Sequence, residues 1–544
     1  MKVLNSKNYF PKKKLKNKKM KRLFKLFSKE NSIRGASIIL IITLTLSNIL
    51  GLLRDRFLTK NISTFDLDIY YASFRIPDLI FNFLILGTIT SAFIPIFSDF
   101  LAKKNEEEAW HVTNLLLNLA LIFTLLSALI LYIFMPNIVH IVVPKFDNFR
   151  LLETIKYSRL LMLTPVFFSI SYIMGGVLNS YKRFFVYSLA PLVYNASIIV
   201  GAILAPAYGL KGVVYCVIAG SIFHALIQLP AAIKLGFSYR PVFDFQNATL
   251  KRIVKLMLPR TLSMGAGQIM LIIFTAIASA LAAGSITAFN LANNIQTVPI
   301  VVLGTSFATA IFPTLSEKIA QNDFKNFSFY LNRAIKAIAF LMIPASLIFF
   351  LMRAQIVRLI LGSGKFGWDD TKMTAITLGL FSLSLLAQGV IPLLARAFYA
   401  LKNTRTPMYI SIFSIVLSII LAYLFARTLS VAGLALAFSI GSYVNAILLF
   451  YFLRKNHSEA WSEDLIPSLT RTVIISLIMA VFVWLTMHLM ANYVDMTRFT
   501  GILIQAMVSG LVGVIIFLTL SYLLNSDELK WAITRKIAQD RSKN

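Results

Sequence analysis

The sequence has little of what disulfide-linked proteins and common enzymes depend on. Its single cysteine, Cys216, lies in an apolar run and cannot form an intramolecular disulfide. Its five histidines are scattered without the spacing of a zinc site, and no HExxH, GxSxG or Walker motif occurs. We therefore expect no catalytic residue, no metal and no cofactor, and a direct ATPase is disfavoured. An intramembrane enzyme is the weaker alternative.

Acidic residues are scarce relative to basic ones. Lys and Arg total 53 against 23 Asp and Glu, a formal net charge of +30. Along about fourteen apolar segments, 37 of the Lys and Arg residues fall in the two tails, in the loops of one side or at the segment ends beside them, and 15 fall in the loops or segment ends of the other side. Arg260 falls within a segment. This distribution indicates membrane topology rather than nucleic-acid binding, and it predicts that both termini are cytoplasmic.

Long hydrophobic runs dominate what is present. The chain is 58% hydrophobic and 14% charged, with a mean hydropathy of +0.75. Because about 20 apolar residues cross a bilayer, the sequence predicts an all-α integral membrane protein with about fourteen transmembrane helices. The predicted spans are 33–53, 79–98, 111–135, 157–178, 186–206, 212–233, 253–281, 289–312, 333–352, 373–395, 408–426, 431–453, 470–490 and 500–524.

The chain also resembles itself. Gly212 and Gly220 recur as Gly433 and Gly441, at an offset of 221, and the Leu-Gly-Thr triplet at 86–88 returns at 303–305. Six spans per copy is an even number, so the two copies are predicted to be parallel six-helix lobes. The predicted division is a basic cytoplasmic tail (1–32), an N-lobe (33–233), a cytoplasmic linker (234–252), a C-lobe (253–453), spans 13 and 14 (454–524) and a cytoplasmic C-terminal tail (525–544).

Charged residues near the ends of these spans indicate a polar cavity. Ionisable groups at membrane depth face a partner or water rather than lipid, which makes Arg54, Asp55, Arg75 and Arg260 candidates. The planar fork of arginine suits phosphate, so an anionic or lipid-phosphate substrate is expected. Two alternatives stay open. In the first, Arg54 and Asp55 form an ion pair that only holds the end of the helix bundle together. In the second, the Arg260 side chain snorkels to the membrane interface.

Polar residues of the second copy complete the candidate site. Asn293 and Asn294 lie in the eighth predicted span and would line the other side of the cavity. Hydrogen bonding between helices, without substrate contact, is the alternative for this pair.

Several motifs occur in order along the chain: Asn48-Ile49-Leu50-Gly51-Leu52-Leu53-Arg54-Asp55, Phe74-Arg75-Ile76-Pro77, Ala92-Phe93-Ile94-Pro95-Ile96-Phe97, Gly175-Gly176-Val177-Leu178-Asn179-Ser180 and Arg396-Ala397-Phe398-Tyr399-Ala400. Together they resemble the MurJ (MviN) family of lipid II flippases. The resemblance implies fourteen helices of the multidrug/oligosaccharidyl-lipid/polysaccharide exporter superfamily, with two six-helix lobes around a cationic cavity and spans 13 and 14 lining a lipid-tail groove. It also implies alternating access for undecaprenyl-diphosphate-linked disaccharide-pentapeptide, with Arg54 and Asp55 in the family's Arg-Asp position.

This chain departs from the family pattern within the cavity. Neutral residues stand at Asn48, Phe81-Asn82, Leu86 and Asn293-Asn294, where the family usually carries charge. Arg75 and Arg260 are predicted to supply replacement cations. The substrate is expected to be lipid II or a similar undecaprenyl-diphosphate-linked sugar. The alternative is an exporter of another lipid-linked oligosaccharide or polysaccharide.

The resemblance also implies a setting for the protein. The expected location is the bacterial cytoplasmic membrane, surrounded by membrane lipid and in contact with the cell-wall synthesis machinery. The driving force is left open between the membrane potential and a coupling cation.

Overall fold

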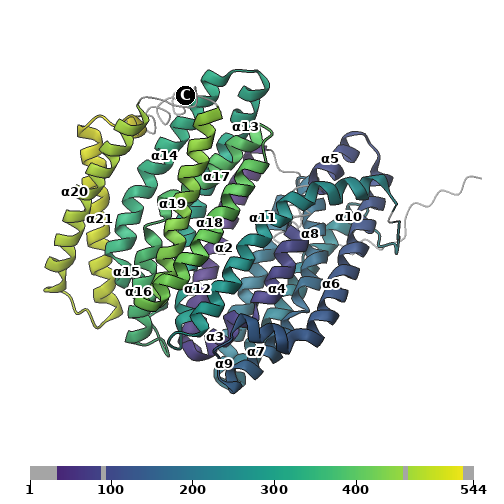
Figure 1. Ribbon diagram of the computed structural model, residues 1–544, viewed down its shortest axis with the longest axis horizontal. Helices are drawn as coiled ribbons and strands as arrows, with labels where there is room; N and C mark the ends of the chain where they lie inside the picture. The colour runs from purple at the N-terminus through teal and green to yellow at the C-terminus, as the bar shows by residue number, and fades with distance from the viewer. Residues whose placement is uncertain (1–32, 87–92, 245, 457–463, 531–544) are drawn as a thin grey trace, which may run out of the picture.

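The computed structural model describes residues 33–86, 93–244, 246–456 and 464–530. Every regular element in these ranges is a helix, as Figure 1 shows. The first part of the chain, called here the N-terminal half, comprises α2 (Ile33–Asn61), α3 (Thr64–Ser73), α4 (Arg75–Ile80), the π-helical η1 (Phe81–Leu86), α5 (Ile94–Ala102), α6 (Glu106–Val142), α7 (Asn148–Leu161), α8 (Thr164–Ser180), α9 (Phe184–Leu226) and α10 (Leu229–Lys234).

The remaining helices form the C-terminal half and an appended pair. The C-terminal half comprises α11 (Ala248–Ser279), α12 (Ser285–Pro299), the π-helical η3 (Ile300–Thr305), α13 (Ser306–Ala320), α14 (Phe324–Leu351), α15 (Arg353–Leu361), α16 (Trp368–Ser382), α17 (Leu385–Ala400), α18 (Arg405–Leu429) and α19 (Val431–Asn456). The appended pair is α20 (Leu465–Ala491) and α21 (Phe499–Leu523). It lies at the edge of the molecule beside α14, where Phe340 meets Phe517 with ring centroids 4.8 Å apart (Figure 1).

Helix length and apolarity confirm an all-α membrane protein. Within the described ranges, nine helical segments are long and apolar enough to cross a membrane, and the pair α16 and α17, bent by 46°, makes a tenth. The segment 184–234 contains two predicted spans, because Gly209 breaks α9 with a φ of 61° in the predicted loop. Helices α2 and α11 lie in two further predicted spans, 33–53 and 253–281, and α4, η1 and α5 lie in or beside a third, 79–98. The architecture is consistent with fourteen spans.

The same backbone geometry recurs in the two halves. Ser430, which separates α18 from α19, has a φ of 53°, and it stands 221 residues after Gly209. Lys182 and Lys402, which precede the predicted fifth and eleventh spans, also have positive φ values of 58° and 59°. The turns of the second half thus repeat those of the first at nearly the spacing found in the sequence. The predicted domain boundaries themselves stay a prediction.

The second crossing begins earlier than predicted. The hydropathy pattern places it at 79–98, but α3 begins at Thr64, where the hydroxyl of Ser63 accepts a hydrogen bond from the backbone N–H of Asp66 at 3.2 Å. Charged residues lower the hydropathy of this segment, and the prediction therefore read it as a loop. In the folded chain the side chains of Asp66, Asp68 and Arg75 have hydrogen-bond partners, so the helices tolerate these charges.

Two segments between predicted spans, 136–156 and 353–372, are also partly helical. In 136–156, α6 continues to Val142 and α7 begins at Asn148, so only a short connection remains. In 353–372, α15 occupies the first part, and the Gly-rich turn is confined to 362–367. Both loops are consequently compact rather than extended.

Candidate functional site

Arg54 and Asp55 form a buried charged pair at the junction of the halves. Nε and a terminal nitrogen of Arg54 donate to Oδ1 of Asp55 at 3.0 and 2.8 Å. The other terminal nitrogen of Arg54 donates to Oδ1 of Asn195, on α9, at 3.2 Å. Asp55 is only 1% exposed. Because a buried carboxylate is costly without partners, Arg54 and Asp55 hold one another in place.

The C-terminal half completes this pair through Asn294. Its amide nitrogen donates to Oδ2 of Asp55 at 2.8 Å, so the two carboxylate oxygens are bound from different halves. Of the predicted site residues, the structure brings together Arg54, Asp55 and Asn294. Asn293 lies elsewhere on the helix surface, where its oxygen accepts a hydrogen bond from Gln296 at 3.0 Å.

Arg75 makes a second connection between the halves. Its Nε donates to the hydroxyl of Thr275 on α11 at 2.6 Å, and a terminal nitrogen donates to Oδ1 of Asn290 on α12 at 2.8 Å. Asn290 lies four residues before Asn294, on the same face of α12. One helix of the C-terminal half therefore presents two amides to two charged positions of the N-terminal half.

Arg260 occupies a position in α11, the helix that also carries Thr275. Its side chain lies outside the described residues. Its predicted contribution to the cavity stays a prediction.

Asp68 is a connecting residue that the sequence analysis did not select. Its Oδ2 accepts a hydrogen bond from the N–H of Gly284 at 2.6 Å, and its Oδ1 accepts from the N–H and hydroxyl of Thr287 at 2.8 and 2.7 Å. A carboxylate satisfies the free N–H groups at a helix start, so Asp68 caps α12 from the opposite half. The available signal was an acidic residue followed by an apolar segment, together with the Gly-Ser pair at 284–285.

Further contacts join the halves at the end of the molecule that carries α3. A terminal nitrogen of Arg56 donates to the carbonyls of Leu359 and Ile360 at 2.6 and 3.1 Å. The hydroxyl of Thr64 donates to Asp370 at 2.7 Å. Together with Asp68, these contacts form what we call the joined end. Arg56 thus belongs to the contact between the halves.

A glycine at the joined end permits the backbone of the C-terminal half to approach the end of α2 closely. The N–H of Lys365 donates to the carbonyl of Lys60 at 3.1 Å. Gly364 has a φ of 63°, and a Cβ placed on it would lie 2.1 Å from that carbonyl oxygen. No larger residue fits there without displacing the end of α2.

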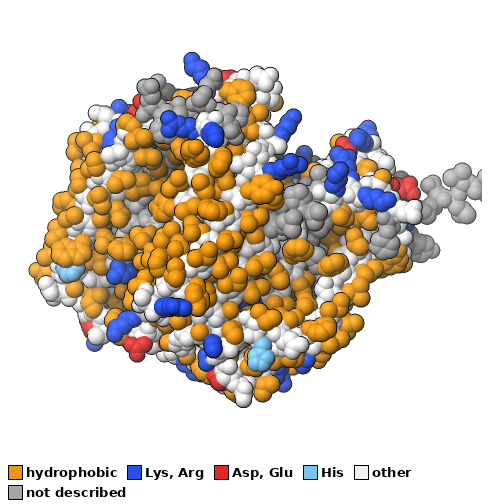
Figure 2. All heavy atoms as spheres, in the orientation of Figure 1, with side chains coloured by type: hydrophobic (Ala, Val, Ile, Leu, Met, Phe, Trp, Pro, Cys, Tyr) orange, Lys and Arg blue, Asp and Glu red, His pale blue; other side chains and the backbone are white. Residues whose placement is uncertain are grey.

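The opposite end of the molecule differs. The surface there is notched between α13 and α5 (Figures 1 and 2). The hydrogen bonds that Asp55, Arg75 and Asp68 make between the halves lie at the centre and at the joined end. Two groups of membrane helices that meet through buried charges and part at one end define a polytopic helical transporter.

Comparison with known proteins identifies the family. The family described as Lipid II flippase MurJ matches residues 63–504, which is most of the chain. The chain therefore belongs to the MurJ family. A probable lipid II flippase MurJ of Buchnera aphidicola subsp. Acyrthosiphon pisum is 28% identical over 453 residues, covering 82% of this chain and 88% of that protein. Lipid II flippase MurJ of Burkholderia cenocepacia is 27% identical, covering 75% of this chain and 81% of that protein.

Solved structures with a similar fold agree with this family assignment. A lipid II flippase MurJ in an inward closed conformation superposes with a TM-score of 0.77 at 25% identity, covering 90% of this chain and 99% of that one. An inward-facing multidrug resistance MATE family transporter of the MOP superfamily reaches a TM-score of 0.66 at 17% identity, covering 78% and 98%. The second match shows a shared fold.

Proposed function

We propose that this protein moves lipid II from the inner to the outer leaflet of the bacterial cytoplasmic membrane during peptidoglycan synthesis. The observation that carries the proposal is Arg54, whose donors are held at the junction of the halves by Asp55 and Asn195. A guanidinium binds phosphate oxygens in the same bidentate way as it binds a carboxylate. The diphosphate of an undecaprenyl-linked sugar would therefore compete with Asp55 for Arg54.

This competition suggests how binding is linked to movement. When diphosphate takes the donors of Arg54, Oδ1 of Asp55 loses its partner while Oδ2 keeps Asn294. A buried carboxylate with fewer partners is less stable, so the contact between the halves weakens. Substrate binding would thus favour opening of the joined end, as alternating access requires.

The positive-inside orientation gives the direction. In that orientation both termini are cytoplasmic and the joined end faces outward. The notched end then faces the cytoplasm, where the lipid-linked precursor is made. We propose this inward-facing arrangement for the state described. The membrane potential or a coupling cation as driving force, and contact with the cell-wall synthesis machinery, stay predictions.

Complementation tests the proposal. Cells depleted of their own lipid II flippase would express the wild-type chain, Arg54→Ala or Arg54→Lys. We expect wild type to prevent lysis and Arg54→Ala to fail, with Arg54→Lys intermediate because it keeps the charge but loses the fork. Equal membrane levels of the three proteins are the control. Full rescue by Arg54→Ala would refute the role of Arg54, and failure of wild type at a normal membrane level would refute lipid II as the substrate.

A second candidate is the export of another lipid-linked oligosaccharide. The observation that favours it is the neutral character of α12, where Asn290 and Asn294 stand opposite Arg75 and Asp55. Purified protein in vesicles would separate the two, by comparing the flipping of lipid II with that of an undecaprenyl-diphosphate carrying a different sugar. Depletion in the native cell adds a second readout. Accumulated lipid II with lysis indicates the first function, and loss of a surface polymer with an intact wall indicates the second.

A further inference from the structure

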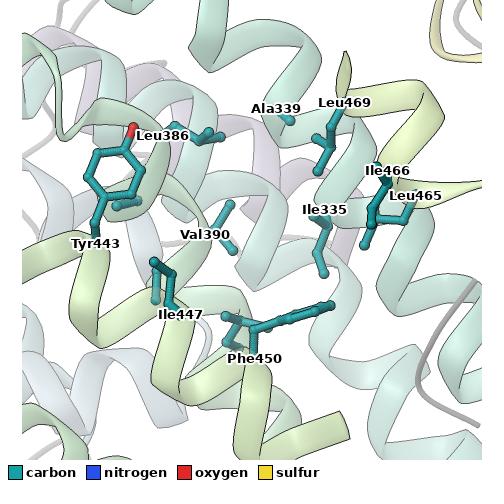
Figure 3. Close-up of a pocket in the computed structure, with 13 residues that line it drawn as sticks. Ile335, Ala339, Leu386, Val390, Tyr443, Ile447, Phe450, Leu465, Ile466 and Leu469 are labelled. Carbon is teal, nitrogen blue, oxygen red and sulfur yellow. The ribbon is translucent and has the colours of Figure 1, made fainter. Parts of the chain in front are cut away.

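An apolar pocket lies outside the junction, between α14, α17, α19 and α20. It has a volume of about 250 Å³ and is lined by aliphatic and aromatic side chains, among which only Tyr443 carries a polar atom. Figure 3 shows these side chains directed toward one space, from Ile335 on α14 to Leu469 on α20. An apolar cavity of about 150 Å³ already accommodates a molecule of benzene size. This pocket therefore has room for a segment of a hydrocarbon chain.

The pocket has a buried floor and a rim that faces the surroundings of the bundle. Ala387 and Leu394 of α17 are almost fully buried beneath it. Ile447 of α19 and Ile466 of α20 are 61% and 55% exposed on either side. In a membrane protein such exposed aliphatic side chains contact lipid, so the pocket opens to the bilayer.

One stripe of α19 connects the pocket to a positive charge. Tyr443, Ile447 and Phe450 line the pocket, and residues spaced by three or four lie on the same face of a helix. Arg454 continues this stripe one turn beyond Phe450, in the last turn of the helix, and is exposed. Lys455 is also exposed but lies about 100° further around the helix. The apolar pocket thus ends at a cation, the pattern that suits an anionic lipid.

We infer that this pocket binds one acyl chain of an anionic membrane phospholipid, whose phosphate is held by Arg454. Such a lipid would fill the space between α20 and the C-terminal half. It would thereby attach the appended pair to α14, α17 and α19 at a place where protein contacts alone leave a cavity. This site is separate from the Arg54 junction and is expected to be occupied throughout transport.

The experiment measures lipid retained by the full-length protein in native mass spectrometry. Purified protein would receive phosphatidylglycerol or phosphatidylcholine with identical acyl chains. We expect wild type to retain phosphatidylglycerol preferentially. Arg454→Gln should lower that preference about fivefold, because one Lys or Arg near anionic lipid contributes about 1 kcal/mol. Lys455→Gln is the matched control and should have a smaller effect, since it lies off the stripe.

A second variant tests the pocket itself. Ala446 lines it from α19 and is partly buried, so Ala446→Phe should fill the space and reduce binding of both lipids. Val416→Phe is the control, because Val416 is 50% exposed on α18 and does not line the pocket. Unchanged melting temperatures would establish that both variants fold.

Three results would overturn the inference. Ala446→Phe retaining as much phospholipid as wild type would place the chain elsewhere. Equal losses in Arg454→Gln and Lys455→Gln would show general charge attraction rather than a headgroup site. Displacement of phosphatidylglycerol by an equal concentration of undecaprenyl phosphate, abolished in Ala446→Phe, would assign the pocket to an isoprenoid tail instead.

Discussion

The second and eighth crossings occupy corresponding places in the two halves but differ in charge. Both begin at the joined end, both contain a π-helical turn, η1 at Phe81–Leu86 and η3 at Ile300–Thr305, and both continue through a proline, Pro95 or Pro313. The second crossing carries Asp68 and Arg75. The eighth crossing supplies neutral hydrogen-bond partners for them, namely backbone N–H groups, a hydroxyl and amides.

This difference shows how the two halves are held together. The second crossing supplies charged groups, and the eighth crossing supplies neutral hydrogen-bond partners. The contact between Thr64 and Asp370 at the joined end is the reverse, with the carboxylate in the C-terminal half. A buried charge with neutral partners can be released more readily than an ion pair across the junction, because each partner recovers its own hydrogen bonds elsewhere. Changes that move or remove charge on either crossing should therefore alter the balance between joined and open states.

Removal of the Asp68 carboxylate is expected to have the largest effect. Asp68→Ala should destabilise the joined end by about 3 kcal/mol or more, because hydrogen bonds to a charged group contribute about 1.5–3 kcal/mol each. Ser285, fully buried at the start of α12, would be changed to Cys in a Cys216→Ser background. Maleimide labelling at this position should increase strongly in Asp68→Ala.

The matched control for this experiment is Asp66→Ala. The carboxylate of Asp66 accepts a hydrogen bond from Ser63 within its own half. Labelling should change little in this variant. Equal labelling of the two variants would mean that Asp68 does not hold the joined end.

Charge added to the eighth crossing should act next. Asn294→Asp places a second carboxylate against Asp55, whose Oδ2 now accepts from the Asn294 amide at 2.8 Å. Like charges in direct contact cost several kcal/mol when desolvated. We expect a lower melting temperature and failed complementation. Asn293→Asp should be milder because Asn293 contacts Gln296 instead, and an equal loss in both variants would contradict the geometry of the junction.

The connection made by Arg75 should appear as an energetic coupling. In a double-mutant cycle of Arg75→Ala and Asn290→Ala, directly bonded partners are expected to couple by about 0.5–3 kcal/mol. Thermal or denaturant unfolding of the purified protein in detergent would give the four stabilities. A pair of unrelated positions, Arg75 and Lys103, should be additive. A coupling no larger than that of this control would show that the bond at 2.8 Å does not contribute.

The most local effect is expected at the glycine of the joined end. Gly364→Ala should cost about 1–2 kcal/mol for its left-handed backbone alone, with an added steric cost against Lys60. Gly367→Ala is the control, because its φ is −78° and only the Asp370 carboxylate approaches, at 3.5 Å. Similar stabilities of the two variants, measured by melting temperature, would argue against a close contact at Gly364.

Much of this architecture follows from the sequence because hydrophobic runs and loop charge are local signals. The break at Gly209 falls between the predicted spans 186–206 and 212–233, where the hydropathy pattern indicates a connection. The helical segment 64–80 could not be found in this way, because two of its charges, Asp68 and Arg75, are compensated by residues about 200 positions later in the chain. A hydropathy average is lowered by those charges and contains no information about their distant hydrogen-bond partners.

The site was predictable to a similar degree. Arg54, Asp55 and Arg75 stood out as charges beside long apolar runs. Asp55 and Arg75 connect the halves, and Arg54 holds Asp55 from within the N-terminal half. Asn290 and Asp68 did not stand out, since an amide in a helix and an acid in an apparent loop are ordinary features. Their importance depends on register between α3, α4 and α12, which is set by tertiary packing.

The turns at Gly209 and Ser430 have a mechanical consequence. Each joins two long helices through a single residue of positive φ. A connection of one residue is too short to lengthen, so neither helix can slide or rotate past its partner. Each of these two helix pairs must therefore move as one rigid body. The bending needed for a transport cycle would then occur in crossings with an irregular turn, such as η1 and η3.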